Sequence, residues 1–429
     1  MSRLYLLGAG AVIEFAYLCF YFLDESPTEV GVFIGVNFLA FILLSILWWK
    51  SRTAPLDPAA AGLIIGFAIL FRLTLIFHPP VGSDDLYRYL WDGRVGAHGI
   101  NPYRYAPADS ALAGLHTALV PSKVNFPHMR TIYPPLAQGM FALSNVLFGE
   151  SPSGLKFLLT LCDLGTIAIL FFLFRCHPRH LLLYAWSPLP VMYVALDGHV
   201  DALGIPFLLL AVALMQRGRT LAGAFSLGLG GLAKLYPLYV VPFLFGTEKG
   251  WRRLVVLLTP VAVFGVVCFA FWEPTGGLLD SFMIYNSIFE FNGSLFSILY
   301  EMLKSNERAH LICALLFAIW MVLLMFLKRS LLEKIFLAFL GFLLLSPVVQ
   351  PWYLLWLAAL LPLRWSLAAF VFLGLSNISN VVVYQYRSTG VWLDNPMLLA
   401  VEYVPVYVLL VREIVRGNFS HGATEAKVA

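Results

Sequence analysis

Apolar runs recur from one end of the chain to the other, and this repetition constrains the fold more than any other feature. Runs of about 17–25 residues, the length at which an α-helix crosses a hydrocarbon core of roughly 30 Å, occur throughout, and several others are shorter or broken by proline. Of the 429 residues, 60% are hydrophobic and only 12% are charged, whereas soluble domains carry about a quarter charged residues. The strands of a membrane barrel would alternate polar and apolar residues, which these runs do not. The sequence therefore predicts an all-α polytopic membrane protein.

The apolar runs are numerous enough for about 12–14 membrane-spanning helices. We expect them to form one integral-membrane domain over residues 1–429. The expected spans lie near 4–23, 30–49, 60–77, 154–174, 181–196, 200–216, 220–233, 235–246, 252–272, 309–327, 332–347, 352–363, 365–384 and 398–414.

Basic residues gather in alternate connections between these spans, such as Lys50 with Arg52 and Arg217 with Arg219. Because such residues favour the cytoplasmic side, we expect both termini to be cytoplasmic. Two long loops, near 78–153 and 273–308, then face outward. The net charge of +4 is small and is spread over short loops. The apolar spans indicate membrane lipid as a partner, and the small, dispersed charge does not favour nucleic acid.

The first outer loop opens with a polar segment, residues 83–103, directly after an apolar run. Its charged side chains are Asp84, Asp85, Arg88, Asp92 and Arg94. The spacing of Asp85, Arg88 and Asp92 predicts an amphipathic helix at the membrane interface, and residues 280–304 suggest a second. Charged groups at a membrane edge are costly unless they are solvated or used, so this segment is a functional candidate.

Asp85 is the first candidate for catalysis in this segment. A carboxylate can accept the proton of a sugar hydroxyl as its oxygen attacks, or it can hold a metal ion. Asp84 beside it can do either. The alternative is structural, since an aspartate is favoured at a helix N-terminus by the helix dipole. No cofactor is required by the sequence, and a divalent cation bound by Asp84 and Asp85 stays an open alternative.

Three further sites place polar groups within apolar surroundings. Lys234 separates two short apolar runs and suits a phosphate as a compact cation, although a snorkelling lysine would look the same. The turn at residues 197–201 offers His199 and Asp201 to sugar hydroxyls, a phosphate or a metal, or it is a simple polar cap. Arg72 lies inside an apolar run, where a cation needs an anionic partner or a phosphate.

The ordered set of these motifs resembles the GT-C superfamily of polyprenyl-phosphate-sugar-dependent glycosyltransferases. The likeness extends to the catalytic subunit of GPI mannosyltransferase I and to prokaryotic multi-pass mannosyltransferases. The matching positions are Asp85 and residues 99–103, 133–136, 188, 198–201, 234–237 and 350–357. The chain departs from the family where its Asp-x-Asp pattern reads Ser83-Asp84-Asp85, where residues 104–132 are inserted, and where His199 replaces an asparagine.

The resemblance implies inverting transfer of a hexose, expected to be mannose, from a polyprenyl-phosphate sugar to a lipid- or glycan-linked acceptor. The reaction is expected on the outer face of a bacterial or archaeal cytoplasmic membrane, or of the endoplasmic reticulum in a eukaryote. Asp85 would deprotonate or orient the acceptor, and Lys234 would stabilise the departing phosphate with Arg94 or Arg72. The remaining expected substrate-binding residues are His199, Asp201, Tyr133, Tyr236 and Gln350.

Two other classes of protein share parts of this pattern. A transporter or lipid-linked sugar flippase also needs many helices and a polar cavity, but it is favoured by inverted repeats and by ionisable residues at the midplane. We find no internal repeat, and the acidic segment lies at one face. A non-catalytic assembly subunit would not require Asp85 and Lys234 to converge, so their positions in the fold separate these alternatives.

Overall fold

The computed structural model describes residues 3–23, 26–273, 277–392 and 395–416. The chain ends, expected to be cytoplasmic, include residues 1–2 and 417–429, which lie outside the described residues. So do residues 274–276 of the second expected outer loop. All statements on the fold below refer to the described part of the chain.

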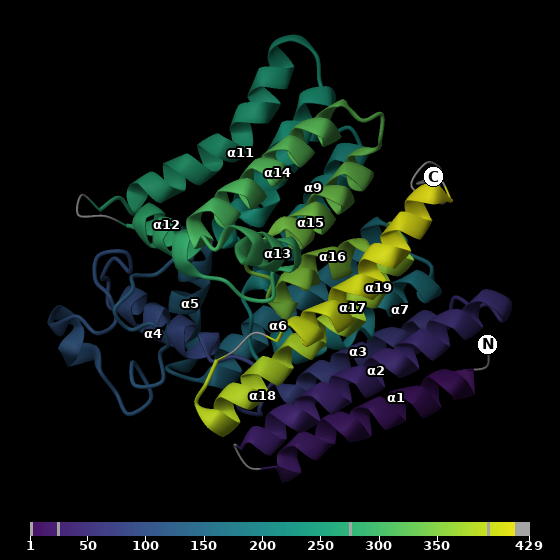
Figure 1. Cartoon of the computed structure of the whole chain (residues 1–429), viewed down its shortest axis with the longest axis horizontal. Helices are drawn as coiled ribbons and strands as arrows, with labels where there is room; N and C mark the ends of the chain where they lie inside the picture. Colours follow the sequence, from purple (N-terminus) through teal and green to yellow (C-terminus); the bar gives the residue numbers. More distant parts are fainter. Residues whose placement is uncertain (1–2, 24–25, 274–276, 393–394, 417–429) are drawn as a thin grey trace.

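The chain folds into helices, most of them joined by short connections (Figure 1). Residues before 200 form α1 (Arg3–Leu18), η1 (Cys19–Phe22), α2 (Pro27–Thr53), α3 (Ala60–Leu75), α4 (Asp85–Ala97), η2 (Ser110–Leu115), α5 (Pro135–Phe148), α6 (Pro152–Ala168), η3 (Ile169–Leu173), α7 (Pro178–Ala185), α8 (Pro188–Pro190) and η4 (Val191–Leu196). The rest form α9 (Asp201–Gln216), α10 (Thr220–Ala233), η5 (Tyr236–Gly246), α11 (Gly250–Ala270), α12 (Leu278–Ile288), α13 (Ser294–Leu303), α14 (Asn306–Phe326), α15 (Leu331–Leu345), η6 (Pro351–Leu354), α16 (Leu355–Leu360), α17 (Leu367–Leu375), η7 (Ser376–Ser379), α18 (Asn380–Thr389) and α19 (Pro396–Val415).

This architecture confirms the predicted all-α polytopic membrane protein. Six helices within the described residues are long and apolar enough to cross a membrane. They run over Arg3–Phe22, Pro27–Thr53, Pro152–Leu173, Gly250–Ala270, Asn306–Phe326 and Leu367–Thr389, with shorter apolar helices between them. α11 and α14 are the least buried of the six, and large apolar side chains such as Phe269 and Ile319 project from them. Such surfaces suit contact with lipid tails.

Local signals in the sequence explain where several helices begin. α6 starts at Pro152, and the Ser151 side chain accepts a hydrogen bond from the backbone of Gly154. α15 starts with a capping box, in which Ser330 and Glu333 each bond to the other's backbone. Such caps satisfy backbone donors that the first helical turn leaves unpaired. Capped starts therefore allow apolar helices to follow each other closely along the chain.

The predicted loop at 78–153 contains two helices packed on each other, α4 and α5. Gly93 permits this contact, since a Cβ there would overlap the carbonyl of Phe141. A predicted amphipathic helix at the membrane interface would turn its charged face to solvent, and the structure differs from this. Arg88 and Asp92 are buried and paired at 2.9 Å, and Gln138 of α5 donates a hydrogen bond to Asp92. These charges hold the helix pair together instead of facing solvent.

Contacts between helices position the start of α4. α1 packs on α2 and α3, and the pair of α4 and α5, at the left of Figure 1, packs on α6. α9 packs on both α6 and α10, and α10 in turn packs on α11. α6 also contacts η4, whose end leads into the turn before α9. The connection before Asp85 contacts the turn at 197–200 through hydrogen bonds to Asp197. This turn carries a second group of polar side chains.

Candidate active site

Asp85 is the first residue of α4, and its carboxylate is partly accessible, with 23% of the side chain exposed. Its Oδ1 accepts a hydrogen bond of 2.9 Å from Nδ2 of Asn125. Burial raises the pKa of Asp85 to about 6. The hydrogen bond from Asn125 opposes this shift, and the charge of Asp84 adds to it. A carboxylate with a pKa near 6 is better suited to accept a proton than one in water.

The turn at residues 197–200 comes close to this carboxylate because two features fix its shape. Gly198 has a φ of +77°, and a Cβ there would lie 2.7 Å from Leu86 of α4. Asp197 accepts hydrogen bonds from the backbone nitrogens of Val81 and Gly82, at 2.8 and 3.0 Å. The turn is thereby bonded directly to the connection that precedes Asp85.

Lys156 of α6 reinforces the same junction from inside the protein. Its buried ammonium donates hydrogen bonds to the backbone carbonyls of Leu75, His78 and Leu196. These carbonyls belong to the end of α3, the connection after it, and the last residue of η4. Sequence reasoning did not single out Lys156, since a lone lysine at the start of an apolar run reads as a snorkelling side chain. In the fold it positions both segments of the site.

His199 projects from this turn toward Asp85, with 3.9 Å between its Nδ1 and Oδ2 of the carboxylate. Its ring stacks on the indole of Trp352 at a centroid distance of 3.8 Å. Burial lowers the pKa of His199 well below its ordinary value, so the imidazole is neutral at physiological pH. Within the described residues neither ring nitrogen has a hydrogen-bond partner. A neutral imidazole offers one donor and one acceptor, which suits a sugar hydroxyl.

Lys234 and Asp201 form an ion pair beside His199. The ammonium of Lys234 lies 2.8 and 2.7 Å from the two carboxylate oxygens of Asp201. Asp201 is buried and also accepts a hydrogen bond of 2.7 Å from the indole of Trp356. An ammonium has three N–H groups, so pairing with Asp201 leaves a donor over. Because 16% of the Lys234 side chain is exposed, that donor can reach a ligand.

Aromatic side chains surround these charges. Lys234 lies over the rings of Tyr353 and Tyr236, at 4.6 and 5.1 Å from their centroids. The hydroxyl of Tyr353 is 2.9 Å from that of Tyr285 on α12. Tyr133 packs edge-on against Tyr89 of α4, and burial and then the charge of Asp85 raise its pKa. Gln350 directly precedes η6, which carries Tyr353. The expected residues Asp85, Tyr133, His199, Asp201, Lys234, Tyr236 and Gln350 therefore come from segments that meet here.

The other two expected cations have partners elsewhere. Arg72 pairs with Asp163 at 2.5 Å in the buried interior and donates to the carbonyls of Ala68 and Ala185. Arg94 pairs with Glu150 at 2.6 Å and donates to the carbonyl of Leu115. Both arginines thus hold parts of the fold together. Their predicted contact with a phosphate stays a prediction.

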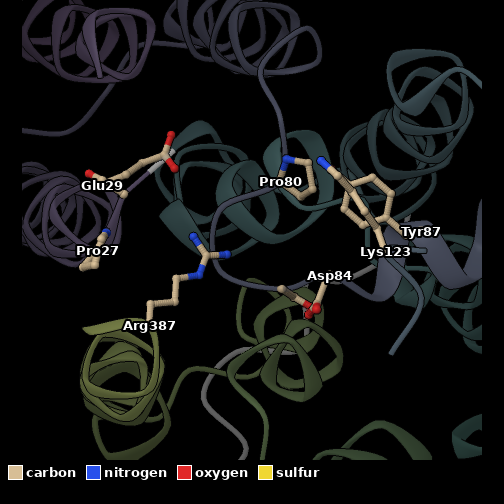
Figure 2. A pocket seen from close by; sticks show the side chains of 9 residues that line it. Pro27, Glu29, Pro80, Asp84, Tyr87, Lys123 and Arg387 are labelled. Atoms are coloured by element: carbon tan, nitrogen blue, oxygen red, sulfur yellow. The ribbon is translucent and has the colours of Figure 1, made fainter. Parts of the chain in front are cut away.

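Asp84 faces different surroundings from Asp85. It lines a separate pocket together with Lys123 and Arg387, as Figure 2 shows. Across the described residues, no group of three His, Cys, Asp or Glu side chains is arranged to hold a metal ion. Sequence reasoning also missed Asn125, the hydrogen-bond partner of Asp85. The only available signal was its place in the insertion at 104–132, which no motif covers.

Two comparisons bear on what this site does. Residues 7–247 match the model of the α-(1→6)-mannopyranosyltransferase family, N-terminal domain, and residues 295–413 match the MptB C-terminal domain. Comparison with curated proteins gives no match. The first match covers more than half of the chain, which defines a membrane glycosyltransferase. The chain belongs to the α-(1→6)-mannopyranosyltransferase family, so the expected mannosyltransferase is confirmed and the transporter and subunit alternatives are disfavoured. The single domain over 1–429 stays a prediction.

Proposed function

We propose that the protein transfers mannose from a polyprenyl-phosphate sugar to a hydroxyl of a lipid- or glycan-linked acceptor. The convergence of Asp85, His199 and the Lys234–Asp201 pair is the observation that carries this proposal. A proton acceptor and a phosphate-binding cation are the two groups that this displacement needs. A lipid-linked donor also suits an enzyme whose sequence contains no nucleotide-binding motif.

The proposed reaction is one displacement with inversion at the anomeric carbon. The acceptor oxygen forms a bond to C1 of mannose while the bond from C1 to the phosphate oxygen breaks. Asp85 takes the proton of the acceptor hydroxyl, and the polyprenyl phosphate leaves with the bonding electrons. Lys234 stabilises the negative charge that builds up on the departing phosphate. Asp201 and Trp356 orient that ammonium, and His199 hydrogen-bonds the sugar.

Binding of a divalent cation is the alternative role for Asp84 and Asp85. In that reading Asp84 and Asp85 share an ion that screens the donor phosphate. The different surroundings of the two carboxylates favour Asp85 as a base acting alone. Chelation tests this choice directly. We expect EDTA to leave transfer unchanged, and a loss that Mg²⁺ or Mn²⁺ restores would favour the cation.

Transfer of labelled mannose is the direct test of the proposed function. Membranes that contain the protein are supplied with polyprenyl-phosphate mannose carrying a radiolabelled sugar, together with a mannoside acceptor. We expect a labelled, extended glycan that is absent when Asp85→Asn membranes are used. Transfer from a nucleotide-linked mannose while polyprenyl-phosphate mannose synthesis is blocked would contradict the lipid donor.

The outward orientation of the site has its own test. Ser122 is exposed in the connection that also carries Asn125, and Gln216 is exposed at the end of α9. In intact cells a membrane-impermeant thiol reagent should label Ser122→Cys and leave Gln216→Cys unlabelled, both compared with the parent protein. Gln216→Cys should react after the cells are opened. The reverse pattern would place the site in the cytoplasm.

A further inference from the structure

The pocket beside the proposed active site has the size and lining of a ligand site. Its volume is about 310 Å³, at the lower end of the roughly 300–1,000 Å³ typical of small-molecule sites. Its wall comes from the start of α2, the connection before α4, the first turn of α4, the insertion at 104–132 and α18. Ser26 and Ser83 belong to its polar lining. Figure 2 shows the charged and aromatic side chains that line it, which are Glu29, Asp84, Tyr87, Lys123 and Arg387.

The charges of this pocket balance. Two carboxylates, Glu29 and Asp84, face two cations, Lys123 and Arg387, so the formal charge of the lining is zero. A site for a phosphate or another anion would be expected to carry an excess of cations, and a metal site an excess of carboxylates. Charged donors and acceptors in equal number suit a neutral ligand with many hydroxyls, because each hydroxyl both donates and accepts hydrogen bonds.

The two charges on opposite walls are available to such a ligand. Within the part of the chain that the structure describes, neither the carboxylate of Asp84 nor the guanidinium of Arg387 takes part in a hydrogen bond or ion pair. Lys123 lies over the ring of Tyr87, 5.1 Å from its centroid, which holds this cation at the rim. In Figure 2 the Arg387 side chain extends from α18 toward the space between Glu29 and Asp84.

Two segments separate the pocket from the proposed reaction centre, and each contributes to both sides. Asp84 lines the pocket while Asp85, the next residue, is the proposed base. Lys123 lines the pocket while Asn125, two residues on, bonds to Asp85. The pocket lining therefore adjoins Asp85 itself on one segment and lies two residues from its hydrogen-bond partner on the other.

We propose that this pocket is an acceptor subsite that holds a neutral, non-reacting sugar unit of the glycan acceptor. The proposal rests on the proposed function and names where that acceptor binds. Asp84 and Glu29 accept hydrogen bonds from the sugar hydroxyls, and Arg387 and Lys123 donate to them. The terminal sugar of the same acceptor then presents its hydroxyl to Asp85.

The test compares acceptors of two lengths in Arg387→Met. A trimannoside long enough to enter the pocket and a monomannoside are each given to the full-length enzyme with the same lipid donor. Loss of a charged hydrogen bond should raise KM for the trimannoside about tenfold or more. KM for the monomannoside, KM for the donor and kcat should not change. Lys123→Met should have the same pattern with a smaller effect.

Arg308→Met is the matched control, because Arg308 is an exposed arginine of α14 outside the pocket. It should change none of these constants. Equal KM changes for both acceptors, or a change in the donor KM alone, would overturn the proposal. The same measurements are made with the enzyme in vesicles of different anionic lipid content. If the effect of Arg387→Met depends on that content and not on acceptor length, the pocket binds a lipid headgroup and the proposal is overturned.

Binding without turnover separates this proposal from the proposed function. Purified Asp85→Asn protein, expected to be inactive, should bind the trimannoside as tightly as the unmodified chain does in the absence of donor. The double variant Asp85→Asn/Arg387→Met should bind it about tenfold more weakly. If the unmodified chain transfers no mannose but the two variants bind the trimannoside in this way, the proposed function is contradicted and the proposed subsite is not. Equal binding by both proteins would defeat the subsite.

Discussion

Arg72 and Lys234 are two cations in apolar surroundings, and the fold uses them in different ways. Arg72 lies on α3 with no side-chain exposure and pairs with Asp163, which also accepts a hydrogen bond from the hydroxyl of Tyr184. Lys234 follows α10, pairs with Asp201, and keeps 16% of its side chain exposed. It lies beside His199, whose ring nitrogens have no hydrogen-bond partner among the described residues. Both centres keep a hydrogen-bonding group without a partner among the described residues, Nη2 of Arg72 in one and the ring nitrogens of His199 in the other, but only the Lys234 centre is open to a ligand.

The difference teaches how a functional charge is recognised within a membrane protein. Ionisable groups inside a membrane are functional candidates by default, so a cation alone does not distinguish the two centres. The exposure of the cation to a ligand does. A cation buried with its anionic partner stabilises the fold, whereas a partly exposed cation can also contact a substrate. If this contrast is right, substitution of Lys234 lowers kcat, whereas substitution of Arg72 lowers stability.

Asp85→Asn should have the largest effect on transfer. The amide keeps the shape of the carboxylate but cannot accept the proton of the acceptor hydroxyl. Loss of a general base typically reduces the rate about 100- to 10,000-fold. The measurement is kcat with saturating donor and acceptor, in membranes that contain equal amounts of each protein.

Asp84→Asn is the neighbouring control for this change. Because Asp84 lines the other pocket, its loss should weaken acceptor binding and reduce kcat much less. If Asp84→Asn is the inactive variant and Asp85→Asn turns over normally, the base has been assigned to the wrong residue. If both variants stay active, this segment does not carry the chemistry.

Lys234→Met should reduce kcat about 100- to 1,000-fold, comparable with removal of one preorganised donor to a developing anion. The loss should be partly offset when a donor with a better leaving group than the polyprenyl phosphate is supplied. That selective recovery distinguishes leaving-group stabilisation from a folding defect. A loss of equal size for both donors would contradict the role of Lys234 at the phosphate.

Arg72→Met should instead act on stability. Breaking a buried ion pair leaves the Asp163 carboxylate without its partner and costs about 3–5 kcal/mol. We expect a lower thermal midpoint in detergent and a smaller amount of folded protein. The enzyme that remains folded should have a kcat close to that of the unmodified chain. The double variant Arg72→Met/Asp163→Asn should recover part of the stability, and a selective loss of kcat would place Arg72 in the reaction.

The sequence predicted the helical class well because lipid imposes a length and an apolar composition on each span. It also singled out Asp85, His199, Asp201 and Lys234, since polar groups on interrupted apolar runs are conspicuous. It could not tell Lys234 from Arg72, because pairing depends on contacts such as the one with Asp163, far away in the chain. The hydrogen bonds that Asn125, Lys156 and Asp197 make to distant segments could not be predicted for the same reason.

The smallest expected effects are on the pH dependence of kcat/KM. The proposed base works when ionised, and the pKa of Asp85 is about 6, so activity should fall as the pH drops through that value. Asn125→Ala removes a hydrogen bond that lowers this pKa, so the midpoint should move to higher pH while the rate well above it recovers. Asp84→Asn removes a like charge that raises the pKa, so the midpoint should move the opposite way. Opposite shifts from two neighbours of one carboxylate would identify Asp85 as the titrating group. Shifts in the same direction, or none, would assign the pH profile to another residue.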